Sequence, residues 1–440
     1  MSAAVARSPR ALAAQALIRI ERGGYANLVL SGLLEESGFP PRDRNFAARL
    51  VYGTLERQRT LDARLNCFLK KPIDRLDAQV RVSLRLGLYQ ILYMDAVPTA
   101  AAVSESVKLT RSLGKSSAAG MVNAVLRRAG GSFTPQFTTR AEQLGVEYSV
   151  SDAVASLLYD AWGERAQSIL AASFRTPAMT IRVNTLKITA QELMQRFTEK
   201  GIAAIPAGIE NGLSLQGVGE ITRLPEFREG LFHVQGAASQ IAAAALDPQP
   251  GQRVLDLCAA PGGKSATLAQ RMKNQGALFS CDAAASRLSL IGKLLSRLGI
   301  TCVQVLCNDA TIQNPDLTEM DRVLCDVPCS GLGVLAKKPD IRYKDLKELP
   351  KLIQTQRAIL ETGAAALRTG GRLVYSTCTI NPEENQQIVR DFLAGHPEFR
   401  LLEPQLTGDF EPLREDGMLT FLPDICDTDG FFVACLERLW

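Results

Sequence analysis

The chain has 440 residues, of which 46% are hydrophobic and 22% are charged, and its formal net charge is only +4. This composition indicates an ordinary soluble globular protein, long enough for two to four domains with cores of their own. No apolar run approaches the length needed to cross a bilayer, so we expect no membrane association.

The cysteines and histidines do not form a recognisable metal-binding pattern. None of the ten cysteines forms a CxxC pair, and His233 and His396 are the only histidines, so zinc has few candidate ligands. We therefore predict no metal site and, in a reducing cytoplasm, no disulfides. Five cysteines lie in apolar, strand-like runs and are predicted to be buried free thiols: Cys258, Cys281, Cys302, Cys307 and Cys325.

The small net charge hides an uneven distribution. Residues 1–130 hold 20 Lys and Arg against 10 Asp and Glu, a balance of +10, which leaves 30 against 36, or −6, for residues 131–440. A basic segment joined to a mildly acidic one is typical of a protein that binds nucleic acid through its first part. A solvated basic surface without a partner is the alternative.

Residues 5–130 are predicted to be helical throughout. The stretches "FAARLVYGTLERQRTLDARLNCFL" and "VRVSLRLGLYQILYM" repeat apolar residues every three or four positions, with arginines on the opposite face. The start, "MSAAVARSPRALAAQALIRI", is interpreted as the first such helix, with a transit peptide as the alternative. A polar connector near residues 131–145 ends this domain, taken as 1–140. Its helix layout, with "DRNFAARLVYGTL" and "LRLGLYQILY", resembles the NusB-like all-α RNA-binding domain.

Residues 141–235 are predicted to form a small α+β linker domain. The stretch "MTIRVNTLK" is strand-like, and helical stretches lie on both sides of it. Arg182 and Asn184 are polar residues in this apolar strand. They are either ordinary polar residues at a strand edge or part of a surface that helps to grip RNA.

Residues 236–440 alternate between apolar strands and helices. Five strands are predicted in "QRVLDLCA", "GALFSCDA", "TCVQVLCND", "DRVLCDVP" and "GRLVYSTCT", with helical stretches such as "ASRLSLIGKLLSRLG" and "KLIQTQRAILETGAAAL" between them. A late strand, "DGFFVACLERLW", ends the chain. This alternation predicts an α/β domain with a mostly parallel, doubly wound sheet.

In such a sheet, ligands bind beyond the carboxyl ends of the strands. The first strand ends in "DLCAAPGGKS", where Gly262 and Gly263 let the backbone approach a ligand at a helix N-terminus. The pattern is neither GxGxxG nor GxxxxGKS, so neither a dinucleotide nor a P-loop is favoured. Asp282, at the second strand end, can accept hydrogen bonds from ribose hydroxyls, and Asp309, at the third, can read an adenine amino group. Although either aspartate alone is often a turn residue, the combination favours S-adenosylmethionine.

Four motifs in this order, "DLCAAPGGKS", "DVPCSGLGV", "KPDIRY" and "YSTCTINPEEN", are similar to those of the RNA 5-methylcytosine methyltransferase family. The NusB-like segment in front narrows the resemblance to bacterial members that act on small-subunit rRNA. It implies a class I, Rossmann-like methyltransferase domain whose cofactor contacts are Cys258, Ala259, Ala260, Pro261, Gly262, Gly263, Lys264, Asp282, Asp309 and Asp326. One departure is "HVQGAASQ", where Gly236 replaces the family's usual aspartate and puts one contact in doubt.

Two cysteines, Cys329 and Cys378, follow the fourth and fifth strands. These strands are neighbours in the usual methyltransferase sheet order, so both thiols should face one cleft. A thiolate that adds to carbon 6 of cytosine gives carbon 5 carbanion character, and Asp326 is placed to interact with ring N3. Either cysteine can attack on physical grounds; the family resemblance implies Cys378 as nucleophile and Cys329 as the residue that assists release.

The expected function is methylation of carbon 5 of a cytosine in 16S rRNA by a cytoplasmic, monomeric enzyme. The same chemistry on tRNA or on another rRNA site is an alternative. A non-catalytic NusB-like RNA-binding or antitermination factor is an alternative of a different class, disfavoured by the two cysteines beside an intact cofactor loop. A Rossmann oxidoreductase is disfavoured by the missing GxGxxG.

Overall fold

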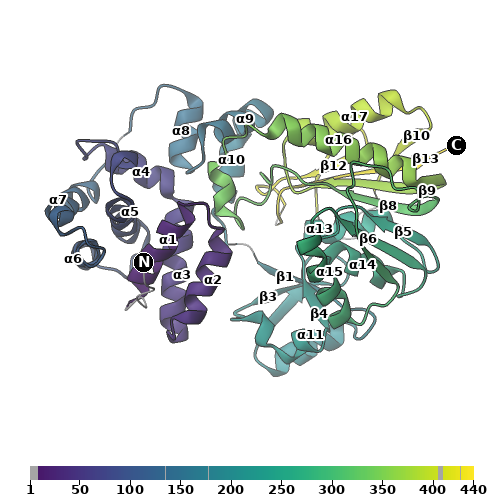
Figure 1. The fold of residues 1–440 in the computed structure, drawn as a ribbon, viewed down its shortest axis with the longest axis horizontal. Helices are drawn as coiled ribbons and strands as arrows, with labels where there is room; N and C mark the ends of the chain where they lie inside the picture. The colour runs from purple at the N-terminus through teal and green to yellow at the C-terminus, as the bar shows by residue number, and fades with distance from the viewer. Residues whose placement is uncertain (1–7, 134, 177, 405–409, 427) are drawn as a thin grey trace. The chain divides into compact units, whose positions relative to one another are not determined.

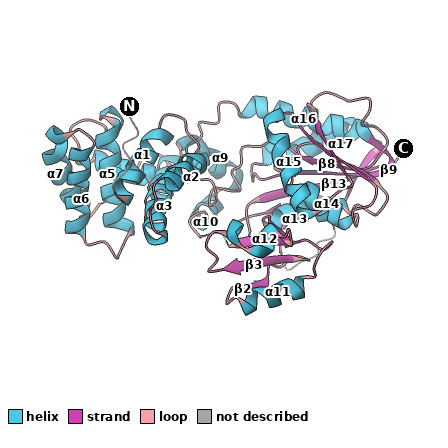
Figure 2. Ribbon diagram, turned by 60° about the horizontal axis from the view of Figure 1, so that its bottom comes forward, coloured by secondary structure: helices cyan, strands magenta, loops and turns pink. Residues whose placement is uncertain are grey.

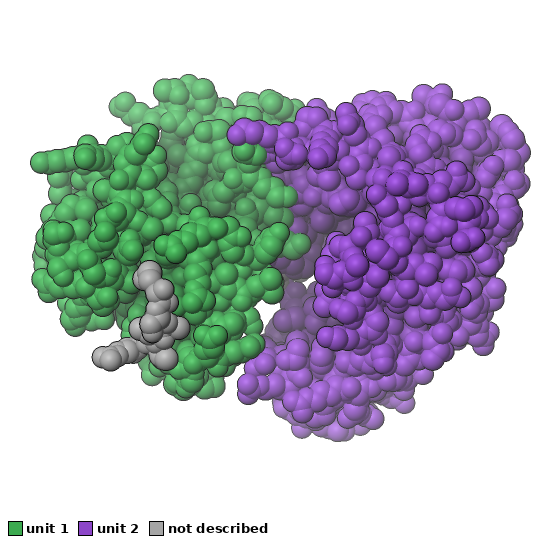
Figure 3. Space-filling view, viewed as in Figure 1, with its two compact units in different colours: residues 1–167, 338–345 green, residues 168–337, 346–440 purple. Residues whose placement is uncertain are grey.

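The computed structural model describes residues 8–133, 135–176, 178–404, 410–426 and 428–440. The chain forms two compact units, one of residues 1–167 with 338–345 and one of residues 168–337 with 346–440 (Figure 3). The three-domain boundaries expected near residues 140 and 235 stay predictions, since these units divide the chain at other positions.

The first unit is helical, as predicted (Figure 1). Leucines spaced along its helices are fully buried, including Leu12, Leu50, Leu61, Leu84 and Leu126. Its helices are α1 (Pro9–Ile20), α2 (Ala26–Glu36), α3 (Pro41–Glu56), α4 (Gln58–Asn66), α5 (Ala78–Tyr93), α6 (Thr99–Ser112), α7 (Ala119–Ala129), α8 (Arg140–Glu147) and α9 (Asp152–Trp162), with short 3₁₀ turns η1 (Ile73–Arg75) and η2 (Ser116–Ala118). Helix α10 (Arg165–Ala172) leads into the second unit.

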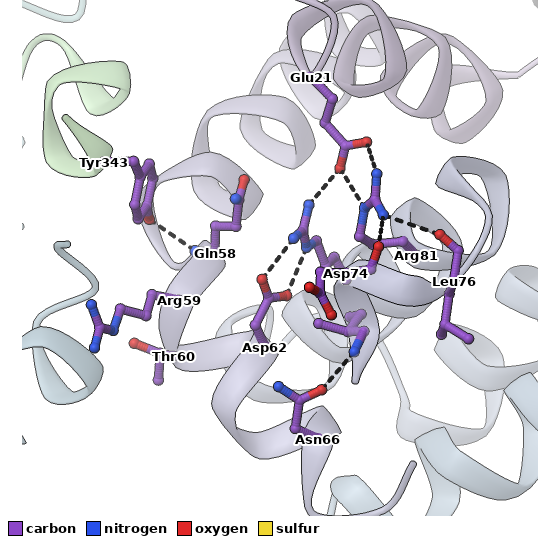
Figure 4. Close-up of polar contacts among 12 residues, drawn as sticks. Glu21, Gln58, Arg59, Thr60, Asp62, Asn66, Asp74, Leu76, Arg81 and Tyr343 are labelled. Atoms are coloured by element: carbon purple, nitrogen blue, oxygen red, sulfur yellow. Dashed lines mark hydrogen bonds and ion pairs between the residues drawn. The ribbon is translucent and has the colours of Figure 1, made fainter. Parts of the chain in front are cut away.

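The arginines of α5 do not all lie on a solvent face, which corrects the expectation for this helix. Arg85 is 7% exposed and pairs with Glu21 at 2.5 Å and with Asp62 at 2.6 Å, and Arg81 pairs with the same Glu21 at 2.7 Å (Figure 4). The burial of Asp62 raises its pKa, and the charge of Arg85 opposes that rise. Part of the basic surplus of this unit is therefore neutralised internally.

The segment 338–345, which contains the "KPDIRY" motif, belongs to the helical unit. Its 3₁₀ turn η4 (Pro339–Tyr343) buries Arg342 completely, and Arg342 donates to the Tyr148 carbonyl at 3.0 Å. The Tyr343 hydroxyl donates to the Leu55 carbonyl at 2.6 Å and accepts from the Gln58 amide at 3.1 Å (Figure 4 shows the contact with Gln58). This motif therefore has a structural role in the first unit.

The second unit begins with a four-stranded antiparallel sheet in the order β2-β3-β1-β4. Figure 2 labels β2 and β3 of this sheet. Strand β1 (Met179–Val183) and helix α11 (Ala190–Glu199) were predicted, whereas β2 (Ala203–Pro206), β3 (Gly212–Gln216), β4 (Phe232–Val234), η3 (Ile221–Arg223) and α12 (Pro225–Arg228) were not. Arg182 and Asn184 are both buried, so the interpretation as an RNA-gripping surface is wrong. Asn184 donates to two carbonyls, and Arg182 donates to Gln270 and to the Glu210 carbonyl.

The rest of the unit is built on a nine-stranded mixed sheet, which confirms the predicted α/β class. Strands β5 (Arg253–Asp256), β6 (Ala277–Asp282), β7 (Val303–Cys307), β8 (Met320–Asp326) and β9 (Leu367–Thr377) are parallel, in the order β9-β8-β5-β6-β7. Strands β13 (Phe431–Arg438), β12 (Met418–Phe421), β11 (Leu413–Glu415) and β10 (Phe399–Leu402) extend it antiparallel beyond β9.

Helices cover both faces of this sheet. Helices α13 (Ala237–Leu246), α14 (Gly263–Arg271) and α15 (Ala285–Leu298) share a core with one face, and α16 (Leu349–Ala366) and α17 (Gln386–Gly395) share a core with the other. The 3₁₀ turn η5 (Pro382–Glu384) precedes α17. The carboxyl ends of the five parallel strands therefore meet at one edge, where the predicted site residues lie.

Candidate active site

A glycine turn links β5 to α14 at this edge. Gly262 has a φ of +104°, and an added Cβ would lie 3.2 Å from the Ile291 Cα, so only glycine fits the turn without strain. Helix α14 starts at Gly263 with no side-chain cap, which leaves backbone N–H groups free for an anionic or polar ligand.

The turn forms one wall of a cavity of about 180 Å³. The cavity is lined by seven of the predicted residues: Cys258, Ala259, Ala260, Pro261, Gly263, Lys264 and Asp326. It is also lined by Val234, Gln235, Gly236 and Ser239, of which the sequence interpretation had noted only Gly236. Gly262, Asp282 and Asp309 are not among the lining residues.

The two predicted strand-end aspartates differ in setting. Asp282, 5% exposed at the end of β6, accepts from the Ala260 amide at 3.3 Å and from the Ala284 amide at 3.0 Å. It thus touches the glycine turn directly. Asp309 is exposed, and its carboxylate accepts from the Thr311 amide and hydroxyl, which lower its pKa. The surroundings of Asp282 fit its predicted role as a ribose partner. Those of Asp309 fit its predicted role as an adenine partner less well.

Asp256 was not predicted as a functional residue. It is fully buried at the end of β5 and accepts from the Ser265 hydroxyl at 2.6 Å, while its Oδ1 atom has no hydrogen-bond partner in the described chain. Burial raises the pKa of Asp256 to about 7. Only the burial of the residue, which a sequence does not display, would have identified it.

Lys264 and Asp326 form an ion pair on the cavity wall. The Lys264 ammonium lies 2.7 Å from one Asp326 oxygen, and the Ser376 hydroxyl donates to the other at 2.9 Å. Burial works against the charge of Lys264, but attraction to Asp326, with a smaller contribution from Cys378, raises its pKa. The ammonium is therefore kept charged beside Asp326 and Cys378.

The two predicted cysteines are brought together. Strands β8 and β9 are hydrogen-bonded neighbours, and the Sγ atoms of Cys329 and Cys378 lie 3.3 Å apart beyond their ends. The hydrogen bond to Cys378, followed by burial, raises the pKa of Cys329. All ten cysteines are free thiols. The prediction of burial is confirmed for Cys281 and Cys325, but Cys258 and Cys302 are only partly buried, and Cys307 is exposed on the outermost parallel strand β7.

Gly236, the departure noted in the sequence, is the N-cap residue of α13. An added Cβ would lie 3.0 Å from the Asp429 Oδ2 and 3.3 Å from the Lys337 ammonium, which pair with each other at 2.6 Å. A side chain at position 236 would have to displace this pair. The absence of a side chain at position 236 therefore leaves room for the Lys337–Asp429 ion pair.

Other kinds of site find little support in the residues described. They contain no group of three or more His, Cys, Asp or Glu side chains placed to hold a metal ion. Burial lowers the pKa of His233 to about 4, so this histidine is neutral. None of the described helices combines the length and apolarity that a membrane span requires.

Comparisons with known proteins agree with this architecture. Residues 243–437 match the family model described as 16S rRNA methyltransferase RsmB/F, residues 7–130 match the NusB family, and residues 154–222 match an RsmF/B-like ferredoxin-like domain.

Individual relatives extend over nearly the whole chain. A protein of Synechocystis named probable ribosomal RNA small subunit methyltransferase B is 36% identical over 95% of this chain and 96% of its own length. The crystal structure titled PH0851 superposes with a TM-score of 0.83 at 26% identity, covering 98% of this chain and 99% of that one. A methyltransferase homolog from Pyrococcus horikoshii is 32% identical, with a TM-score of 0.61 over 69% of this chain and 100% of that one.

Proposed function

Because the chain belongs to the RsmB/F family and is thus an RNA methyltransferase, we propose that it methylates carbon 5 of a cytosine in 16S rRNA with S-adenosylmethionine. The observation that carries this proposal is the pair of thiols, 3.3 Å apart, at the ends of β8 and β9. A methyltransferase acting on a nitrogen or oxygen atom has no need of a nucleophile, whereas carbon 5 must first be activated by addition at carbon 6. We place the reaction in the cytoplasm, on RNA bound by a monomer.

The cavity beside the glycine turn fits S-adenosylmethionine. Its backbone turn admits close approach at Gly262 and Gly263, the free N–H groups of α14 suit a carboxylate, and Asp282 lies against the turn as a ribose partner. Cys258 to Pro261 and Lys264 would complete the contact. When bound there, S-adenosylmethionine supplies an electrophilic methyl group.

Charge distinguishes the two thiols. The Lys264 ammonium attracts negative charge at Cys378. At Cys329 the hydrogen bond to Cys378, burial and, less strongly, the Glu384 carboxylate all oppose a thiolate by raising the pKa. This asymmetry supports Cys378 as the nucleophile. Its sulfur bonds to carbon 6, and the electron pair of the double bond moves to carbon 5. In this proposal Asp326 interacts with ring N3 and so eases the addition.

After carbon 5 has received the methyl group, its proton must leave and the sulfur–carbon bond must break. Cys329 is the base in this step. The largest cause of its raised pKa is the hydrogen bond to Cys378. Once the Cys378 sulfur is bonded to carbon 6 it no longer carries negative charge, so this cause of the raised pKa is removed. The Cys329 proton then passes to solvent, and the Cys329 thiolate takes the carbon 5 proton while Cys378 leaves as a thiolate.

Substitution of the cysteines tests this assignment. Cys378→Ala should abolish methylation while S-adenosylmethionine binding survives, and Cys329→Ala should leave an RNA–protein adduct that persists on a denaturing gel. Cys307→Ala, an exposed cysteine outside the cavity, serves as the matched control and should behave as the parent. Bisulfite sequencing of the RNA locates the methylated cytosine, and chromatography of the digested nucleosides against 5-methylcytidine identifies the methylated atom. Turnover by Cys378→Ala, or methylation at another atom, would sink the proposal.

A further inference from the structure

A fully buried carboxylate, Glu384, lies behind the two thiols. It ends η5, the turn between β9 and α17, and its exposed fraction is 0%. Burial of a carboxylate is costly unless hydrogen bonds satisfy its oxygens. Glu384 therefore needs hydrogen-bond donors from its neighbours, and these bonds fix its position.

Five hydrogen bonds end on this carboxylate. Its Oε1 atom accepts from the Ser330 amide at 2.8 Å and from the Gln356 side chain at 2.9 Å. Its Oε2 atom accepts from the Ser330 hydroxyl at 2.5 Å, from the Asn381 side chain at 3.1 Å and from the Thr379 hydroxyl at 3.3 Å. All five donors are neutral groups.

The donors come from both cysteine-bearing loops. Ser330 directly follows Cys329, and Thr379 directly follows Cys378. Gln356 of α16 also donates to the Pro328 carbonyl at 2.9 Å, so the residues on both sides of Cys329 are connected to the same group. The Ser330 and Thr379 hydroxyls lie 2.7 Å apart and join the two loops directly.

We propose that Glu384 is a positioning residue that sets the separation of the Cys329 and Cys378 thiols by binding both loops to one carboxylate. The catalytic meaning of that separation rests on the proposed function, but the geometric claim does not. A carboxylate offers four acceptor sites and no donor. These sites suit the Ser330 amide and hydroxyl, Gln356 and Asn381, while the Thr379 hydroxyl lies closer to the Ser330 hydroxyl, at 2.7 Å, than to the carboxylate, at 3.3 Å. An amide would turn one oxygen into an NH₂ group that faces other donors.

The variant Glu384→Gln keeps the shape of the side chain and removes this acceptor. Glu383→Gln is the matched control, because Glu383 is adjacent in sequence and exposed. Both are made in the full chain. We expect Glu384→Gln to lower kcat by roughly a hundredfold, as ångström-scale misplacement of reacting groups does, with the KM for RNA within about twofold of the parent. Glu384→Asp, which retains the charge, should recover part of kcat.

A second readout needs neither RNA nor cofactor. The thiol oxidant diamide converts two adjacent thiols into one disulfide, with loss of two protons and two electrons to the diazene, and the rate depends on their separation. Mass spectrometry of the Cys329–Cys378 disulfide should show about tenfold slower formation in Glu384→Gln than in Glu383→Gln. Parent-like disulfide formation in a folded Glu384→Gln protein would overturn the proposal, even if the methylated atom proved not to be carbon 5.

Should Glu384→Gln fail to fold, Asn381→Ala removes a single donor and leaves the carboxylate intact. Its disulfide rate and kcat should fall by a smaller factor, in the same direction. Parent-like values of both in Asn381→Ala and in Thr379→Val together would contradict the proposal. Circular dichroism and cofactor titration confirm that each variant is folded.

Discussion

The burial of Asp256 should make the free energy of unfolding depend on pH. Its pKa is raised to about 7 by burial, from an ordinary value of 3.8. The folded state therefore retains a proton that the unfolded state releases, and the resulting stability is fully present below pH 3.8 and is lost as pH rises through about 7. From pH 5 to pH 8, the parent should lose roughly 3 kcal/mol of unfolding free energy relative to Asp256→Asn.

Urea denaturation of both proteins at the two pH values measures this difference. Subtraction of the variant from the parent cancels the titration of groups that do not interact with Asp256. An equal pH dependence in the two proteins would mean that Asp256 is ionised in the folded state at pH 5.

Asp282 should contribute to cofactor affinity. Its carboxylate is buried against the Ala260 amide of the glycine turn, so Asp282→Ala removes an acceptor of the turn and, in the proposed function, of the ligand ribose. We expect calorimetry to show S-adenosylmethionine binding weaker by about 1–3 kcal/mol. Asp309→Ala should have a smaller effect, since Asp309 is exposed and already bonded within its own turn. Unchanged affinity in Asp282→Ala would place the ribose contact elsewhere.

At the residue level, sequence reasoning located the glycine turn and both thiols but missed Asp256 and Glu384. The glycine turn and the thiols can be recognised in the sequence because reactive or flexible residues stand directly after apolar strands, as Cys329 and Cys378 do. Asp256 and Glu384 are ordinary acids in sequence, and only tertiary burial makes Glu384 the acceptor of donors from three separate segments. The same limitation explains Arg85, whose helical spacing indicated a solvent face.

At the level of elements, the loop after β8 is fixed by close backbone packing. The Gly333 amide donates to the Cys378 carbonyl at 3.0 Å, and its carbonyl accepts from the Gly430 amide at 2.8 Å. A Cβ at Gly333 would overlap the Gly430 carbonyl. Because the obstacle is backbone, the loop itself must shift. Gly333→Ala should therefore lower the unfolding free energy by about 1–3 kcal/mol and reduce kcat as well.

Gly292→Ala is the matched control for this substitution. Gly292 lies inside α15, is exposed, and has nothing within 4 Å of an added Cβ. The change should raise stability by up to about 1 kcal/mol, the difference in helix propensity. Thermal unfolding and turnover of the two variants separate the effect of the loop from that of glycine loss in general. Parent-like activity of Gly333→Ala would show that the loop tolerates displacement.

The elements that sequence predicted best are strands β5 to β9, which lie in apolar runs that alternate with long helices. Strands β2, β3 and β4 lie in no such run and show no strict alternation, so their pairing depends on partners that local sequence does not show. The antiparallel strands β10, β11 and β12 were missed for the same reason. Strand β13, which pairs with β10 and β12, was predicted because "FFVACL" is continuously apolar.

For the whole molecule, the order of the domains was predictable and the course of the chain was not. Residues 338–345 carry a methyltransferase-family motif but pack within the helical unit, through Arg342 and Tyr343. Removal of the N-terminal residues would therefore leave this segment without its partners. A truncated chain is a poor test of RNA binding, and charge substitutions in the full chain are preferable.

The exposed basic residues of the first unit should bind RNA phosphates. Lys70, Lys71, Arg127 and Arg128 are exposed, and among the residues the structure describes none of the four forms an ion pair. Arg128 stacks over Phe68 at 5.2 Å, which places α7 beside the segment that carries the two lysines. Unlike Arg81 and Arg85, these charges are available to phosphates. The double variant Lys70→Gln/Lys71→Gln should weaken RNA binding at low salt without changing S-adenosylmethionine affinity.

The salt dependence distinguishes phosphate contact from a general change of charge. Each lost phosphate contact should reduce the slope of log affinity against log salt by roughly 0.7–0.9, because fewer counterions are released. Lys273→Gln/Lys293→Gln removes two exposed lysines from the second unit and is the matched control. If both double variants lowered the slope equally, RNA would contact both units alike; if neither did, the helical unit would bind RNA through other residues or bind a protein instead.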